Sequence, residues 1–213
     1  MTRNDAVKGR PRGGLADKRR AILAGALAVF ARDGYTRASI DAISATAGVS
    51  TRTIYNHFTD KAQLFQSVIQ ESATLAAEAQ IAIIDRHLGK VTDLESDLVE
   101  FGRAFAAPMA GEHAEHFALV RQIHAEAGHI PPAAIEAWQE TGPRRVRHAL
   151  ADRMRHLSER GLLRAGDPER AALHLMVLIS APGTFRGVMA PTEEEVAETV
   201  ASGVHAFLHG YHP

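Results

Sequence analysis

The sequence predicts an all-α fold of about nine helices, and three observations support this prediction. Apolar residues recur at spacings of three and four along most of the 213 residues, which is the period of an amphipathic α-helix. Alternating apolar and polar runs between turn residues, which are typical of β-strands, are missing. Gly, Ser, Asp and Pro stand where one periodic segment ends and the next begins. We therefore expect helices joined by short turns and no sheet.

The first part of the chain is expected to form four helices, at residues 15–33, 40–47, 51–58 and 61–86. Serine or aspartate precedes each of the last three, where its side chain can accept a hydrogen bond from a free backbone N–H of the first turn. Glycine follows each of the first two, because it adopts the left-handed conformation that ends many helices. These boundary residues are Gly34, Ser39, Gly48, Ser50 and Asp60.

Five longer helices are expected at residues 93–109, 112–127, 131–161, 167–181 and 192–210. Pro143 must kink or restart the third of these, because proline cannot continue the hydrogen bonds of a helix. Residues 171–181 are apolar nearly all round, so we expect burial on several sides. The last helix carries one apolar stripe, which consists of Val196, Val200, Val204, Phe207 and Leu208.

Charge is divided unevenly along the chain. Residues 1–66 carry eleven Lys and Arg against five Asp, a net +6, and the remainder carries a net −7. A basic segment followed by an acidic one is typical of a chain that contacts a polyanion at one end. The chain has no cysteine, which excludes disulfides, Cys-ligated zinc and thiol redox chemistry. Neither a signal peptide nor an apolar run near the roughly 20 residues of a membrane helix is visible, so we expect no membrane partner and a cytoplasmic location.

Residues 39–58, SIDAISATAGVSTRTIYNHF, fit a helix-turn-helix, in which the second helix enters the major groove of DNA. Gly48 permits the tight turn between the two helices. Ile54 and Phe58 lie four residues apart and are expected to point inward. The outward face then offers hydrogen-bonding groups to base edges and an aromatic edge to thymine methyl groups. This face carries Arg52, Thr53, Tyr55 and Asn56, with Thr51 at its N-terminal end.

The segment AGVSTRTIYNHFTDKAQLF at 47–65 resembles the signature of the tetracycline-repressor (TetR/AcrR-like) transcriptional regulators. Ile22-Leu23, Phe30 and Gly34-Tyr35 match the upstream pattern of that family. The resemblance implies base contacts from Thr51, Arg52, Thr53, Tyr55 and Asn56. It implies phosphate contacts from Ser39, Tyr55, His57 and Lys61. Lys61 suits this role independently, because it stands at a helix N-terminus, which favours phosphate.

The same resemblance implies the domain organisation and the partners. A basic arm at 1–14 precedes a DNA-binding domain at 15–75, and residues 76–213 form a helical domain that binds an effector and dimerises. Residues 117–178 are similar to the C-terminal domain of one large branch of the family. Dimers of the family form through their last two helices and bind a pseudo-palindromic double-stranded operator. The expected interface pairs the apolar helix at 171–181 and the last helix at 192–210, with the stripe of Val196, Val200, Val204, Phe207 and Leu208 at its centre.

The arm contains Lys8-Gly9-Arg10-Pro11-Arg12, which resembles the Gly-Arg-Pro core of an AT-hook. An extended backbone would let Arg10 and Arg12 enter a narrow minor groove. The alternative is a disordered basic tail that adds affinity for any DNA sequence.

An effector pocket is predicted from aromatic residues between the two ends of the chain. We expect an apolar or aromatic small molecule there that releases the DNA, with His124 and His148 as polar partners. The alternative for each aromatic residue is the ordinary core. The predicted lining is Phe101, Phe105, Met109, Phe117, His124, Trp138 and His148.

The alternative class is a helical enzyme or metal-binding protein whose N-terminal helices only resemble a helix-turn-helix. The chain has twelve histidines, with pairs at His113/His116 and His205/His209, but one helix face supplies only two of the three or four ligands of a zinc site. No nucleophile elbow, phosphate loop or zinc-protease motif is visible. We therefore predict no metal, no cofactor and no enzymatic activity, and a DNA-binding regulator that acts as a repressor.

Overall fold

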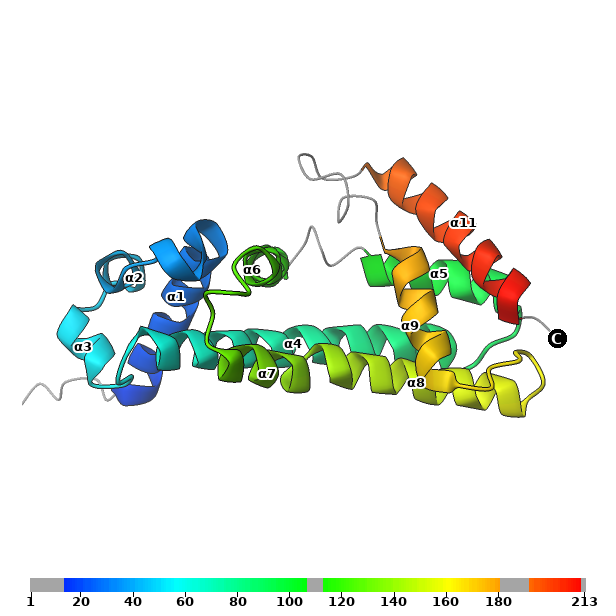
Figure 1. The fold of residues 1–213 in the computed structure, drawn as a ribbon, viewed down its shortest axis with the longest axis horizontal. Coiled ribbons are helices and arrows are strands. Elements are labelled where there is room, and N and C mark those ends of the chain that lie inside the picture. Colours follow the sequence, from blue (N-terminus) through cyan, green and yellow to red (C-terminus); the bar gives the residue numbers. More distant parts are fainter. Residues whose placement is uncertain (1–13, 107–112, 181–191, 212–213) are drawn as a thin grey trace, which may run out of the picture.

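The computed structural model describes residues 14–106, 113–180 and 192–211, and every regular element in these residues is an α-helix. The predicted all-α fold is confirmed. The molecule is elongated, with α1 (Leu15–Arg37), α2 (Ile40–Ala47) and α3 (Thr51–Tyr55) at one end (Figure 1). The long helix α4 (Lys61–Leu88) runs from this end toward the other (Figure 1). None of the described helices is long and apolar enough to cross a membrane.

The predicted N-terminal boundaries agree with the structure. Ser39, Ser50 and Asp60 each accept a hydrogen bond from the backbone N–H three residues on, and so cap α2, α3 and α4. Gly48 ends α2 in the left-handed conformation, with φ of 66°. Three boundaries differ: α3 ends at Tyr55 rather than at residue 58, α4 ends at Leu88 rather than at residue 86, and helical structure resumes after a break at Gly34 as far as Arg37.

The remaining helices begin and end within a few residues of the predicted positions. They are α5 (Leu94–Ala106), α6 (Ala114–Ala125), α7 (Pro132–Thr141), α8 (Pro143–Glu159), α9 (Pro168–Ile179) and α11 (Glu193–Tyr211). Prolines begin α7, α8 and α9, because the first residue of a helix needs no N–H partner. Pro143 therefore restarts the helix, as one of the two predicted possibilities.

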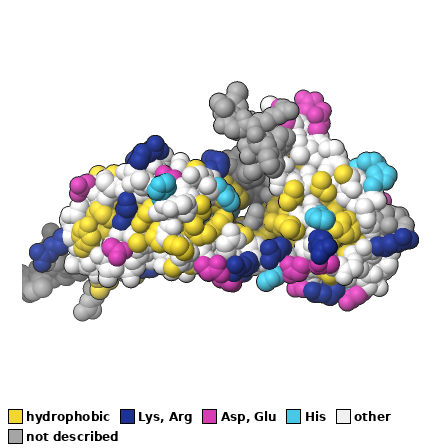
Figure 2. Space-filling view, viewed as in Figure 1, with side chains coloured by type: hydrophobic (Ala, Val, Ile, Leu, Met, Phe, Trp, Pro, Cys, Tyr) yellow, Lys and Arg dark blue, Asp and Glu magenta, His cyan; other side chains and the backbone are white. Residues whose placement is uncertain are grey.

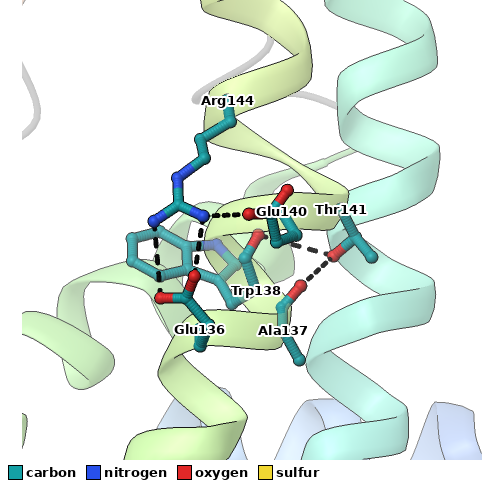
Figure 3. Close-up of polar contacts among 6 residues, drawn as sticks. All are labelled: Glu136, Ala137, Trp138, Glu140, Thr141 and Arg144. Carbon is teal, nitrogen blue, oxygen red and sulfur yellow. Dashed lines mark hydrogen bonds and ion pairs between the residues drawn. The ribbon is translucent and has the colours of Figure 1, made fainter.

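Helices α7 and α8 remain linked across this restart (Figure 3). The guanidinium of Arg144, at the start of α8, donates hydrogen bonds to the carboxylates of Glu136, at 2.7 Å, and Glu140, both on α7. Thr141 Oγ1 donates to the carbonyl oxygen of Ala137 at 2.7 Å. The Arg144 bonds join the two helices end to end alongside α4, whereas the Thr141 bond lies within α7.

The buried apolar side chains form two cores. The head core joins α1–α4 with α6 and α7, and includes Phe30, Phe65 and Trp138. The body core joins the second half of α4 with α5, α8, α9 and α11, and includes Phe101 and Phe207. The predicted division at residue 75 falls inside α4, which contributes to both cores. That division stays a prediction.

A buried polar pair connects α4 with α6. Ser72 Oγ and His116 Nδ1 lie 2.8 Å apart and share a hydrogen bond. Burial, with a smaller effect of the neighbouring His113, lowers the pKa of His116 from 6.5 to about 4. The ring is therefore neutral at neutral pH, and it ties the two helices together without burying a charge.

Candidate nucleic-acid interface

Helix α3 lies at the tip of the elongated molecule, far from α9 and α11 (Figure 1). Ile54 and Phe58 are 1% and 4% exposed and anchor this tip in the head core, as the sequence predicts. Arg52, Tyr55 and Asn56 are exposed. Tyr55 keeps 55% of its surface exposed, which is unusual for an aromatic residue without a partner. The tip thus offers a guanidinium, a phenol and an amide to solvent from one short helix.

The two threonines of α3 are half-buried. Thr53 Oγ1 lies 2.8 Å from Ser50 Oγ, and the Thr53 backbone N–H donates to the same oxygen at 3.2 Å. The Thr53 hydroxyl therefore belongs in part to the cap of α3. Thr51 is the first residue of the helix. Arg52 and Asn56 are better placed than either threonine to reach a base edge.

The angle of α3 is set by close packing of α2 on α1. A Cβ added at Gly25 of α1 would lie 2.8 Å from the Cβ of Ala47, so the two helix backbones touch. At the turn, the Val49 backbone N–H donates to the carbonyl oxygen of Ser44 at 3.1 Å. This packing leaves little freedom for α3 to tilt relative to α1.

Of the residues predicted to contact phosphate, Ser39 and Tyr55 are exposed and His57 is half-buried. Ser39 Oγ accepts the Ala42 backbone N–H at 3.1 Å, so this side chain caps α2. A helix N-terminus concentrates free N–H groups and favours an anion. These contacts stay predictions.

Lys61 has partners within the chain that the sequence did not reveal. Its Nζ donates to the carbonyl oxygens of Tyr35 at 2.9 Å, Ala38 at 3.2 Å and Thr36 at 3.4 Å. It also lies 4.8 Å from the centroid of the Tyr35 ring. All three ammonium protons are thus occupied at the end of α1. A phosphate contact by Lys61 would have to compete with these bonds, and the structure gives the residue a positioning role.

The arm residues Arg10 and Arg12 lie outside the described residues. Their minor-groove contacts stay a prediction.

The predicted effector-pocket residues are divided between the two cores. Phe101 is completely buried in the body core, and Phe105 packs against it with ring centroids 5.2 Å apart. Met109 lies outside the described residues. Phe101 therefore belongs to the ordinary hydrophobic core, which is the alternative to a pocket role.

The other pocket residues lie elsewhere. Trp138 is 5% exposed in the head core, and the ring of His124 meets it edge-on at 5.6 Å. Phe117 is half-buried beside His116. His148 is exposed, with its Nε2 3.6 Å from a Glu169 oxygen. The described residues do not bring His148 and Phe101 together, because His148 faces solvent and Phe101 is enclosed in the body core, and the effector pocket stays a prediction.

The apolar stripe of α11 is directed toward the protomer's own core. Val200 and Val204 are 0% exposed, Phe207 is 1% exposed and Leu208 is 8% exposed within a single chain. These four side chains therefore offer little surface to a partner from within one chain, and their role in the dimer interface stays a prediction. Val196 is half-buried and packs against the same core.

The exposed apolar residues of this end lie instead on α9. Leu173, Val177 and Leu178 are 45%, 56% and 37% exposed. They border a shallow groove together with Ala206 and Gly210 of α11. The sequence carried the signal for this surface, because residues 171–181 are apolar nearly all round and one core can cover only one side.

Among the described residues, no group of three or more His, Asp or Glu side chains is arranged to hold a metal ion. His205 Nε2 and His209 Nε2 lie 2.9 Å apart on the exposed side of α11, and His116 is occupied by Ser72. The geometry of the described residues therefore gives no support to the metal-binding alternative.

Family comparisons match both halves of the chain. Residues 96–213 match the C-terminal domain of AefR-like transcriptional repressors. Residues 22–68 match the tetR family of bacterial regulatory proteins.

Individual proteins agree with these matches. A structure assigned to the TetR-family transcriptional regulators of Mesorhizobium loti has 31% identity and a TM-score of 0.82, over 96% of this chain and 100% of that one. The flavonoid-responsive regulator FrrA has 28% identity and a TM-score of 0.62, over 93% and 98%. The transcriptional repressor AcnR of Corynebacterium diphtheriae is 39% identical over 64 residues, which are 30% of this chain and 34% of AcnR. The match to this curated relative thus spans about a third of its length.

Replacing Lys61 with Met should lower the free energy of unfolding by about 1–3 kcal/mol, because carbonyl oxygens at the end of α1 lose a charged donor. Urea denaturation followed by circular dichroism measures this change. Lys90→Met, at an exposed lysine beyond α4, is the matched control and should have little effect. Unchanged stability in the Lys61 variant, with weaker binding to all DNA sequences alike, would restore the phosphate-contact interpretation.

Proposed function

Because the chain belongs to the TetR family and is a DNA-binding transcriptional regulator, we propose that it is a repressor that binds a pseudo-palindromic operator as a homodimer. The observation that carries this proposal is the exposed face of α3 at the tip of the molecule. The buried side chains of Ile54 and Phe58 hold this face in place. Members of this family are generally non-enzymatic DNA-binding proteins, so the enzyme or metal-binding alternative is not favoured.

Readout of the operator is assigned to the exposed face of α3. An arginine can donate two hydrogen bonds to guanine, and an asparagine can both donate to and accept from adenine. Arg52 and Asn56 supply these groups, and Tyr55 can contact thymine methyl groups or a phosphate. Ser39 and His57 then serve as the neighbouring phosphate contacts.

Arg52→Ala or Asn56→Ala should relax the base preference at one position of each half-site, at a cost of about 1–3 kcal/mol where a bidentate contact is lost. Selection from a random DNA pool with the wild type defines the operator, and the same selection with each variant measures the loss. Arg103→Ala, at an exposed arginine on α5, is the control. An equal loss of affinity for operator and scrambled DNA would instead assign Arg52 to the phosphate backbone.

A second copy of the chain is proposed to cover the apolar surface of α9 and α11. Figure 2 shows hydrophobic side chains at the surface where these helices lie. The two helices are in backbone contact, since a Cβ added at Gly203 would lie 2.2 Å from the carbonyl oxygen of Leu178. They present the shallow apolar groove with Leu173, Val177 and Ala206, and an isologous dimer can bury the same surface of both copies.

Val177→Asp should produce a folded monomer, because a buried interface cannot accommodate two unpaired carboxylates. Sedimentation measures the mass, and operator binding should fall by about tenfold or more because one head cannot span two half-sites. Ala82→Asp, at an exposed position on α4, is the control and should remain dimeric. Val200→Asp should unfold the protomer instead. A dimeric Val177 variant would place the interface elsewhere.

A small apolar or aromatic molecule is proposed to release the DNA. The structurally similar FrrA is described as flavonoid-responsive, which makes flavonoids the first class to test. Trp138 remains a candidate contact, because its Nε1 is buried and has no hydrogen-bond partner among the described residues. A ligand that accepts from this N–H would lie where α6 meets α7, against His124.

Titration of a flavonoid panel should change the fluorescence of Trp138, the sole tryptophan of the chain. An effector must bind the free protein more tightly than the operator complex, by the factor with which it weakens DNA binding. The measurement is therefore made with and without operator. Ligands that bind equally well in both cases are not effectors, and finding only such ligands would contradict this mechanism.

A further inference from the structure

The junction between α1 and α2, residues 34–38, is contacted from two directions. Lys61 of α4 donates to its carbonyl oxygens, as described above. From the other direction comes Glu126, at the C-terminal end of α6. Glu126 Oε2 accepts the Thr36 backbone N–H at 2.9 Å and the Thr36 hydroxyl at 3.0 Å. An ammonium group thus binds the acceptors of the junction and a carboxylate binds its donors.

Gly34 makes room for this carboxylate. Its φ of +77° lies in the left-handed region that favours glycine. A Cβ at this position would lie 2.3 Å from Glu126 Oε1 and 3.1 Å from Gln122 Oε1. One carboxylate oxygen therefore binds Thr36 while the other lies against the bare Cα of Gly34. Within the described residues, Glu126 forms no ion pair, so this junction is its polar partner.

Helix α6 is held at its opposite end as well. His116, in its first turn, shares the buried hydrogen bond with Ser72 of α4. Between these two ends Leu119 and Ile123 are buried in the head core. Helix α6 belongs to the segment that matches the AefR-like C-terminal domain, whereas the junction belongs to the segment that matches the tetR-family domain. The hydrogen bonds of Glu126 therefore connect these two segments at the junction that leads into α2 and α3.

We propose that Glu126 is a positioning residue for operator binding. Its carboxylate holds the junction, and thereby fixes how the closely packed unit of α1, α2 and α3 is oriented relative to α6. Hydrogen bonds weaken steeply as the distance and angle depart from ideal, so a shift of about 1 Å at the end of α6 releases Thr36. The position of each recognition helix in a dimer then depends on α6. This inference rests on the proposed function for its readout.

The experiment compares Glu126→Ala, Glu126→Gln and Glu115→Ala in the full-length protein. Gln keeps an acceptor oxygen for Thr36, and Glu115 is an exposed glutamate of the same helix. Glu126→Ala should bind the full operator about tenfold more weakly, while its affinity for a single half-site changes little. It should also lose discrimination against an operator with one base pair inserted between half-sites, because two freed heads tolerate other spacings. Glu126→Gln should restore most of both properties, and Glu115→Ala should match the wild type.

Hydrogen exchange of the Thr36 amide provides a direct readout of the contact. Exchange should be faster in Glu126→Ala than in Glu126→Gln, with the core amides of α4 unchanged. If Glu126→Ala binds the full operator with wild-type affinity and spacing preference, the proposal is overturned while the proposed function stands. An equal loss on full operator, half-site and scrambled DNA would also overturn it, because that pattern reports general destabilisation. Failure of the wild type to select any operator would instead reject the proposed function.

Discussion

Helix α4 supplies buried side chains to both hydrophobic cores, and the placement of the DNA-binding tip depends on this shared helix. Leu64 and Phe65 belong to the head core, and Ile84 and Leu88 belong to the body core, about five to seven turns farther along. Close-packed interiors have low compressibility and transmit strain, so a displacement at one end of α4 is felt at the other. Lys61, the first residue of α4, joins this helix to the carbonyl oxygens at the end of α1.

Local features of the fold could be predicted because their causes lie within a few residues. The caps at Ser39, Ser50 and Asp60 need only a side-chain oxygen and a nearby N–H, and the left-handed turn needs only Gly48. The outward face of α3 follows from helical period once Ile54 is assigned to the core. The resemblance to the family predicted which residues of that face contact DNA, and it predicted the arrangement of the two domains.

The dimer surface, the partners of Lys61 and the surroundings of the aromatic residues could not be predicted from the sequence. An apolar stripe indicates burial but does not identify the element that covers it. Val204 is covered by its own protomer, whereas Val177 is left at the surface, although both look alike in the sequence. Long side chains pose the same problem: Lys61 stands at a helix start, where a phosphate is plausible, yet its ammonium folds back onto Tyr35. Phe101 and Trp138 are predicted to line one pocket, yet they belong to different cores. In each of these examples the environment of the side chain depends on residues that are distant in the sequence.

The closeness of Gly34 to Glu126 limits how freely the two halves of this chain can be exchanged with those of other regulators. A chimera cut at residue 75 would carry Gly34 without its carboxylate, and would leave the head core without Leu119 and Ile123. A larger residue at position 34, joined to this body, would meet the carboxylate instead. Successful recombinants therefore need to inherit α6 together with the head, which makes the transferable unit discontinuous in sequence.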